Sequence, residues 1–168
     1  NNSTDMFNNA KAHYYMGNHN VAREGFVQVS KEGIVEANYY LGMIMEENED
    51  YQGATSYYKE FLSAPLDEYD FSDYYLAYVY NKLGYSYLKL EEYEKALESF
   101  NFGLELEVKS MDKILSHNKV VALEFLGEYS SAYNLLEEYV DLYPEDKEAL
   151  RELEFARTRL PQTSLADD

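Results

Sequence analysis

The stretch YNKLGYSYLKLEEYEKALESF, residues 80–100, decides how this chain folds. Its first part holds four residues at offsets of zero, three, four and seven: Tyr80, Leu83, Gly84 and Tyr87. Its second part holds three residues at offsets of zero, three and seven: Tyr93, Ala96 and Phe100. Such offsets place each set on one face of an α-helix. The stretch therefore predicts two helices that are joined by a short turn and pack through these faces.

The second helix of this pattern recurs along the chain. An alanine is followed four residues later by a large side chain in the pairs Ala22 and Phe26, Ala54 and Tyr58, Ala96 and Phe100, and Ala132 and Leu136. The alanines are 32, 42 and 36 residues apart, close to a repeat of about 34 residues. We therefore expect repeated antiparallel helix pairs. We also expect Gly84 and Ala96 to face each other, because two small residues let helix axes approach closely.

The pattern of residues 80–100 resembles the tetratricopeptide repeat signature, with Tyr80 in place of the usual tryptophan. The preceding unit is similar through Leu41 and Gly42, whereas the first and last units keep only the second helix. The resemblance implies an all-α, right-handed superhelical solenoid of antiparallel helix pairs, with about four repeats and a C-terminal capping helix. Its expected parts, within one domain over 1–168, are repeats at about 3–36, 35–68, 77–110 and 113–146, a capping helix at 144–160 and a tail at 161–168.

Composition narrows the classes of partner. The chain has 168 residues, of which 14 are basic and 32 acidic, for a net charge of −18. This field repels phosphate backbones and anionic lipid surfaces, so we expect no nucleic acid partner. The acidity serves either solubility or attraction to a basic partner. No apolar run approaches the ~20 residues of a transmembrane helix, so we expect no transmembrane segment in this chain.

Residues that carry catalytic chemistry are sparse or poorly spaced. Cysteine is absent, and the nearby histidines His13 and His19 do not have the spacing of a metal pair on one helix face. Adjacent carboxylates such as Glu46 and Glu47 point about 100° apart on a helix and are typical of solvated turns. No glycine-rich phosphate loop is present. We therefore expect a protein that is not an enzyme, with no metal site and no cofactor.

The resemblance also implies that the first helix of each pair lines a concave groove that binds a protein or peptide. Tyrosine and asparagine suit peptide recognition because they offer contact area and directional hydrogen bonds. The alternative, that several of these tyrosines only pack between units, stays open. The candidate partner-binding residues are Phe7, Lys11, Tyr39, Met43, Tyr78, Asn81, Lys82, Tyr85, Lys89, His117 and Asn118.

Some members of the family grip the C-terminal carboxylate of heat-shock chaperones with lysines and asparagines at set groove positions. That pattern is not met here, since Tyr40 and Tyr78 stand where an asparagine and a lysine would be needed. We therefore expect no clamp for a chaperone tail.

The leading functional hypothesis is a non-catalytic protein–protein interaction module that binds a peptide segment or helix in its concave groove. The alternatives are an exported or surface-attached module that binds glycan or cell-wall polymer, and a structural protein that self-associates. The polar start, Asn1 to Asp5, has no initiator methionine. It favours an exported or membrane-anchored protein, with a cytoplasmic one as the alternative.

Overall fold

The computed structural model describes residues 2–162, and this range is helical without a strand. Its α-helices are α1 (Asn2–Tyr15), α2 (His19–Lys31), α3 (Ala37–Glu47), α4 (Tyr51–Leu62), α5 (Asp73–Lys89), α6 (Tyr93–Glu105), α7 (Asp112–Phe125), α8 (Tyr129–Leu142) and α9 (Lys147–Arg157). Two short 3-10 helices, η1 (Leu66–Glu68) and η2 (Lys109–Met111), lie between pairs. Of the expected tail, residues 161–162 have no regular structure and 163–168 lie outside the described range.

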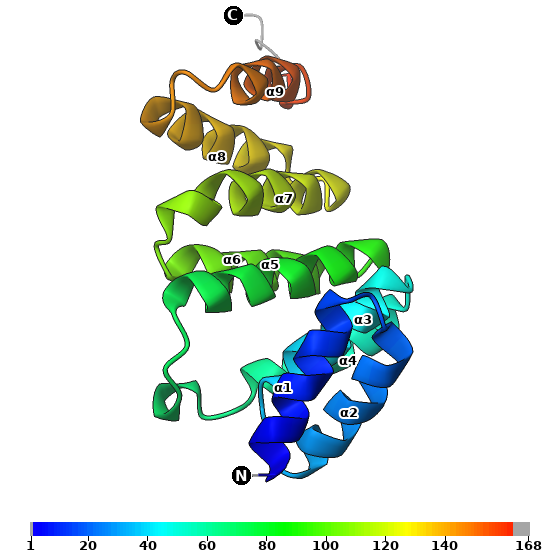
Figure 1. Cartoon of the computed structure of the whole chain (residues 1–168). Coiled ribbons are helices and arrows are strands. Elements are labelled where there is room, and N and C mark those ends of the chain that lie inside the picture. The colour runs from blue at the N-terminus through cyan, green and yellow to red at the C-terminus, as the bar shows by residue number, and fades with distance from the viewer. Residues whose placement is uncertain (1, 163–168) are drawn as a thin grey trace, which may run out of the picture.

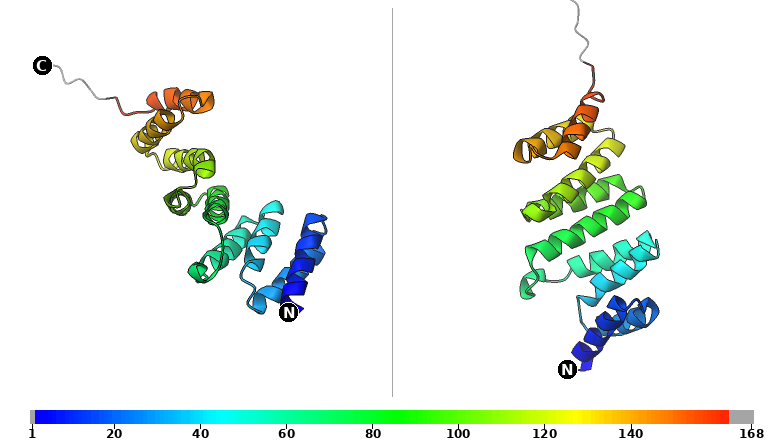
Figure 2. Two further views of the ribbon diagram at one scale, coloured as in Figure 1. Left: turned by 60° about the vertical axis from the view of Figure 1, so that its left-hand side comes forward. Right: turned by 45° about the horizontal axis from the view of Figure 1, so that its top comes forward.

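The helices stack in chain order from the N-terminal to the C-terminal end of an elongated, curved molecule (Figure 1, Figure 2). Each α-helix packs against the next one along the chain, and α5 also contacts α7. Helices α1 to α8 form four antiparallel pairs, and α9 covers the last of them. The expected all-α solenoid of helix pairs is confirmed.

The recurring alanines lie at the centre of the packing. Ala22, Ala54, Ala96 and Ala132 are all buried, with at most 1% of their surface exposed. The large side chains four residues after them are buried as well. One core cluster runs from α1 to α7, and a smaller one joins α7, α8 and α9. The sequence pattern therefore identified the buried face of each second helix correctly.

In the second and third pairs, the two helices approach closely where a glycine of the first helix meets an aromatic ring of the second. A Cβ added at Gly84 would stand 2.7 Å from Cδ1 and Cζ of Phe100, and one added at Gly42 would stand 2.5 Å from Cε1 of Tyr58. The three atoms nearest to such a Cβ at Gly84 all belong to Phe100. The glycine makes room for the ring four residues after the alanine.

The turn inside each pair has the same backbone geometry. Residues 17, 49, 91 and 127, each five residues before a recurring alanine, have φ values of 82°, 58°, 59° and 75°. In each turn the following residue donates its N–H to a carbonyl five residues earlier, at 2.8 to 2.9 Å. This is the Schellman arrangement, which places a left-handed residue just after a helix. Gly17 and Gly127 adopt it without a side-chain penalty, whereas Glu49 and Glu91 carry a Cβ there.

Residues 63–72 separate the second and third pairs as an extended connection that contains η1 (Figure 1). The side chain of Ser72 then caps α5 by accepting a hydrogen bond of 3.1 Å from the N–H of Tyr75. No helix within residues 2–162 combines the length and apolar character needed to cross a membrane.

Candidate functional site

The inner face is defined here as the side of the solenoid formed by the first helices of the pairs, α1, α3, α5 and α7, together with α9. The candidate residues from the sequence all lie on the first four of these helices. Their side chains differ widely in exposure, so the structure separates them into groups with different surroundings.

Two of the candidates, Phe7 and Asn81, are buried in the folded chain. Phe7 is 7% exposed, and its ring lies 5.9 Å, edge to face, from the rings of both Phe26 and Tyr40. Asn81 is also 7% exposed and accepts a hydrogen bond of 2.9 Å from Nδ2 of Asn118. Both are buried because neighbouring helices cover positions that would be exposed on a single helix. Phe7 stabilises the core, and Asn81 links α5 to α7.

Three candidates come together at the centre of the inner face. The ring centroids of Tyr39 and Tyr78 are 6.5 Å apart, and Nζ of Lys82 lies 5.5 Å from the centroid of Tyr78. Nζ of Lys82 also lies 3.1 Å from Oε1 of Glu46. Burial opposes the charged form of Lys82, but Glu46 and Tyr78 together outweigh it and raise the pKa of Lys82. The ammonium of Lys82 is therefore already paired within the protein.

Tyrosine hydroxyls hold other carboxylates near this centre. Tyr58 donates a hydrogen bond of 2.7 Å to Oε2 of Glu46, and Tyr14 donates one of 2.8 Å to Oε1 of Glu47. Burial and the nearby carboxylate both raise the pKa of Tyr58. Through these bonds, neutral hydroxyls satisfy carboxylates in a chain that has only 14 basic residues for 32 acidic ones. They also show that many of the tyrosines are part of the packing.

The remaining candidates do not form one cluster. Met43 is half-buried against the core, and Nζ of Lys11 lies 4.8 Å from the centroid of the buried Phe7 ring. Lys89 lies in the same way over Tyr85, at 5.4 Å. Near the C-terminal end, His117 lies apart from all of these and lines a pocket.

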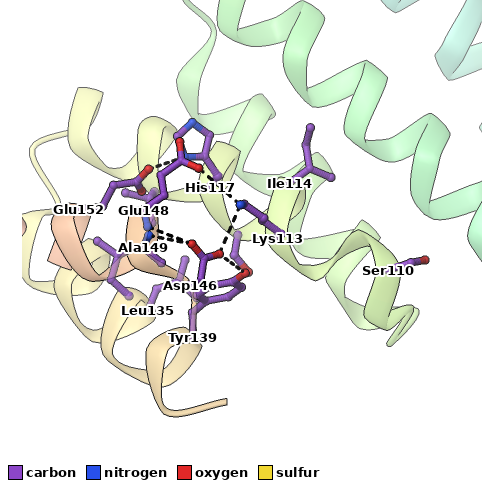
Figure 3. A pocket seen from close by; sticks show the side chains of 13 residues that line it. Ser110, Lys113, Ile114, His117, Leu135, Tyr139, Asp146, Glu148, Ala149 and Glu152 are labelled. Atoms are coloured by element: carbon purple, nitrogen blue, oxygen red, sulfur yellow. Dashed lines mark hydrogen bonds and ion pairs between the residues drawn. The ribbon is translucent and has the colours of Figure 1, made fainter. Parts of the chain in front are cut away.

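The pocket opens between α7 and α9 and has a volume of about 370 Å³ (Figure 3). Its walls are mainly apolar, from Ile114 and Val120 of α7, Leu135 and Leu136 of α8, and Ala149 of α9. Ile114 is 47% exposed although it is a large apolar residue. This is an apolar cavity that side chains of this chain leave open.

Charged groups form the rim of the pocket. Nζ of Lys113 lies 3.4 Å from Oδ2 of Asp146 and 3.4 Å from Oε2 of Glu148, and Nδ1 of His117 lies 3.1 Å from Oε1 of Glu152. Figure 3 shows these groups gathered along the edge where α7 meets α9. The rim joins two helices that otherwise contact each other little, and it leaves the apolar walls accessible.

Asp146 has a fixed place in this rim because it caps α9. Its Oδ1 accepts hydrogen bonds of 3.2 and 3.1 Å from the N–H groups of Glu148 and Ala149, and its Oδ2 accepts one of 2.9 Å from the hydroxyl of Tyr139. The backbone hydrogen bond from Ala149, followed by that from Tyr139, lowers the pKa of Asp146. The carboxylate thus anchors α9 against α8 and keeps a negative charge at the pocket.

The sequence pattern identified only His117 among the residues that line this pocket. A signal for the rest was present, because Ile114 adds an apolar residue outside the packed stripe of α7, and Ser116 and Ala149 are too small to close the space between α7 and α9. In residues 2–162, no group of three histidine, aspartate or glutamate side chains is placed to hold a metal ion.

Helix pairs of this kind, with small residues at the close approaches, define a helical repeat solenoid. Two tetratricopeptide repeat family profiles match the sequence, over residues 7–71 and 77–107. The chain belongs to the tetratricopeptide repeat family, whose members act as scaffolds for protein–protein interaction.

Solved structures of the protein MamA have the same fold. A crystal structure of MamA superposes with a TM-score of 0.77 at 16% identity, over 94% of this chain and 81% of that one. The MamA RS-1 ArsTM double mutant gives 0.75 at 17% identity, over 95% and 85%, and MamA AMB-1 gives 0.71 at 17% identity, over 94% and 82%. A search of curated proteins finds no significant match. At these identities the likeness concerns the fold alone.

Proposed function

We propose that this chain is a non-catalytic protein-interaction module that binds a peptide segment or a helix of a protein partner along its inner face. The observation that carries the proposal is the open apolar pocket of about 370 Å³ between α7 and α9. A cavity of this size falls within the usual range of binding pockets, roughly 300 to 1,000 Å³.

The pocket has the layout of a small interface. Its apolar walls would receive the large side chains that carry most binding energy, and its charged rim would surround them with polar contacts. Because residues of both α7 and α9 line the pocket, a segment that crosses its opening can place one side chain between the two helices. The pocket is therefore the natural anchor point of the inner face.

The tyrosines at the centre of the inner face would extend the contact. Tyr74 is 52% exposed and lies with its ring 6.4 Å from that of Tyr78, nearly parallel at 20°. Such flat rings provide contact area at modest cost in side-chain entropy. Lys82, which is already paired with Glu46, lies over the ring of Tyr78 and contributes by holding it in place.

A selection from a random peptide library tests the proposal. Peptides that bind the folded chain are isolated, and their affinities are measured by fluorescence anisotropy. We expect the Ala149→Leu variant, which fills the pocket, and the Ile114→Ala variant, which shortens its wall, to weaken binding by about tenfold, the effect of about 1.4 kcal/mol.

Ser131→Leu, an exposed position of α8 outside the pocket, is the matched control for added apolar volume and should bind as the parent does. Circular dichroism checks that each variant keeps its helices. A selection that yields no binder, or binders equally strong for Ala149→Leu, contradicts the proposal. The glycan-binding alternative has no support from the comparisons, and we do not propose it.

A further inference from the structure

The charges around the pocket are unequal. Three carboxylates, Asp146, Glu148 and Glu152, line it, and they face the single ammonium of Lys113. Lys113 lies 3.4 Å from both Asp146 and Glu148 and therefore offsets one of these charges. On the formal count that gives the chain −18, in which histidine is uncharged, the lining has an excess of two negative charges beside an apolar cavity.

Two of these carboxylates can reach a ligand. The side chain of Glu148 is 64% exposed and that of Glu152 is 30% exposed, whereas that of Asp146 is 13% exposed. Asp146 is occupied by the cap of α9 and by Tyr139. Glu148 and Glu152, one turn apart on α9, are thus the groups that a bound segment would meet first.

We propose that the segment bound in this pocket is basic: it inserts one large apolar side chain between α7 and α9 and sets a lysine or arginine beside it against Glu148 and Glu152. This inference deepens the proposed function and rests on it. Arginine fits best, because its planar guanidinium can pair with carboxylates through two parallel hydrogen bonds.

Charge complementarity supports this partner over others. The chain as a whole carries a net charge of −18, so an acidic segment is repelled on approach and a basic one is attracted. A bound apolar side chain would also exclude water from the rim, which strengthens the attraction between the remaining charges. Lys82 does not favour an acidic segment either, because its ammonium is already paired with Glu46.

Three synthetic peptides with blocked ends separate the two parts of the inference: Gly-Leu-Arg-Arg-Gly, Gly-Leu-Glu-Glu-Gly and Gly-Gly-Arg-Arg-Gly. Each is titrated into the chain, and the methyl resonances of Ile114, Leu135 and Leu136 are followed by NMR. We expect the first peptide to shift these resonances and to bind at least tenfold more tightly than either of the others.

The double variant Glu148→Gln/Glu152→Gln removes both charges without shortening the side chains and should weaken binding of the first peptide at least fivefold. The matched control is Glu138→Gln/Asp141→Asn, which removes two charges from exposed positions of α8 outside the pocket. It should bind as the parent does.

Equal binding of the acidic peptide, or unchanged binding by the Glu148→Gln/Glu152→Gln variant, overturns the charge part and leaves the proposed function standing. Equal binding of the peptide without leucine overturns the apolar part. If none of the three peptides shifts the pocket resonances, the inference is wrong. The library selection then decides separately whether the inner face binds peptides at all.

Discussion

The ring of Phe100 lies over the backbone of Gly84, so close that a methyl group at Gly84 would stand 2.7 Å from two of the ring carbons. The same relationship holds one unit earlier between Tyr58 and Gly42. In both pairs the ring lies on the second helix and fills the space that the missing side chain leaves on the first. In these two units the glycine is therefore matched to the ring and sets how closely the two helices pack.

The Gly84→Ala variant should lower the free energy of unfolding by about 1 to 3 kcal/mol, the usual cost of an overpacked core. The ring of Phe100 is fully buried, and the close packing of protein interiors leaves little room for it to move. Urea unfolding followed by circular dichroism measures the change.

Ser131→Ala, at an exposed position of α8, is the control for Gly84→Ala and should stay within about 0.5 kcal/mol of the parent. If the ring is the cause, the cost of Gly84→Ala becomes smaller in a Phe100→Leu background. Strict additivity of the two substitutions would show that Gly84 and Phe100 are not coupled.

The Glu91→Gly variant should raise the free energy of unfolding by about 0.5 to 1 kcal/mol. Glu91 has φ of 59°, a conformation that costs a residue with a Cβ roughly 1 to 2 kcal/mol. Glycine also has more conformational freedom in the unfolded chain, which lowers the stability gained from relieving this strain by about 0.5 to 1 kcal/mol. Thermal unfolding would show the gain as a higher Tm.

The control for Glu91→Gly is Glu98→Gly, which removes the same side chain from an exposed position inside α6. It should destabilise by about 1 kcal/mol, because glycine disfavours a helix interior. Gly127→Ala, at the equivalent left-handed position, should also destabilise. A loss of stability in Glu91→Gly would contradict the strain argument.

Stability should fall at alkaline pH. Burial, and then the hydrogen bond to Asp146, raise the pKa of Tyr139 to about 12, whereas an unfolded tyrosine titrates near 10. Between these values the unfolded chain has lost a proton that the folded chain keeps. The contribution of Tyr139 is thus complete below pH ~10 and is lost as the pH rises toward 12.

Urea unfolding at pH 8 to 11.5, combined with phenolate absorbance, measures this loss. Tyr139→Phe should reduce the alkaline decrease, and the part that stays is expected from other buried tyrosines with a raised pKa, such as Tyr58. The same alkaline slope in Tyr139→Phe and in the parent would exclude Tyr139 as a source.

Asn81→Ala should lower stability by about 1 to 2 kcal/mol, because it leaves the amide of Asn118 without its acceptor. Peptide affinity for the pocket should change less than twofold, since Asn81 is buried and does not line the pocket. A variant of normal stability with weakened binding would return Asn81 to the set of partner contacts.

Much of the fold follows from local patterns. The offsets of Tyr80, Leu83, Gly84 and Tyr87 indicate one helix face, and the recurring alanines indicate the face of each second helix. Such patterns work because the repeat buries the same positions in every unit. The candidate site is less predictable. Of the inner-face residues chosen from the sequence, Phe7 and Asn81 are buried, and only His117 lines the pocket.

By itself, the sequence determined that the chain forms stacked helix pairs, where their alanines pack and that the surface is acidic, because these properties depend on neighbours in the chain or on composition. Tertiary structure alone decided that the ring of Phe100 lies against Gly84, that Asn81 bonds to Asn118, and that a cavity remains between α7 and α9. The physical reason is that helical periodicity fixes only the direction in which each side chain points around the axis of its own helix. The distance and rotation between neighbouring helices come from how all their side chains fit together.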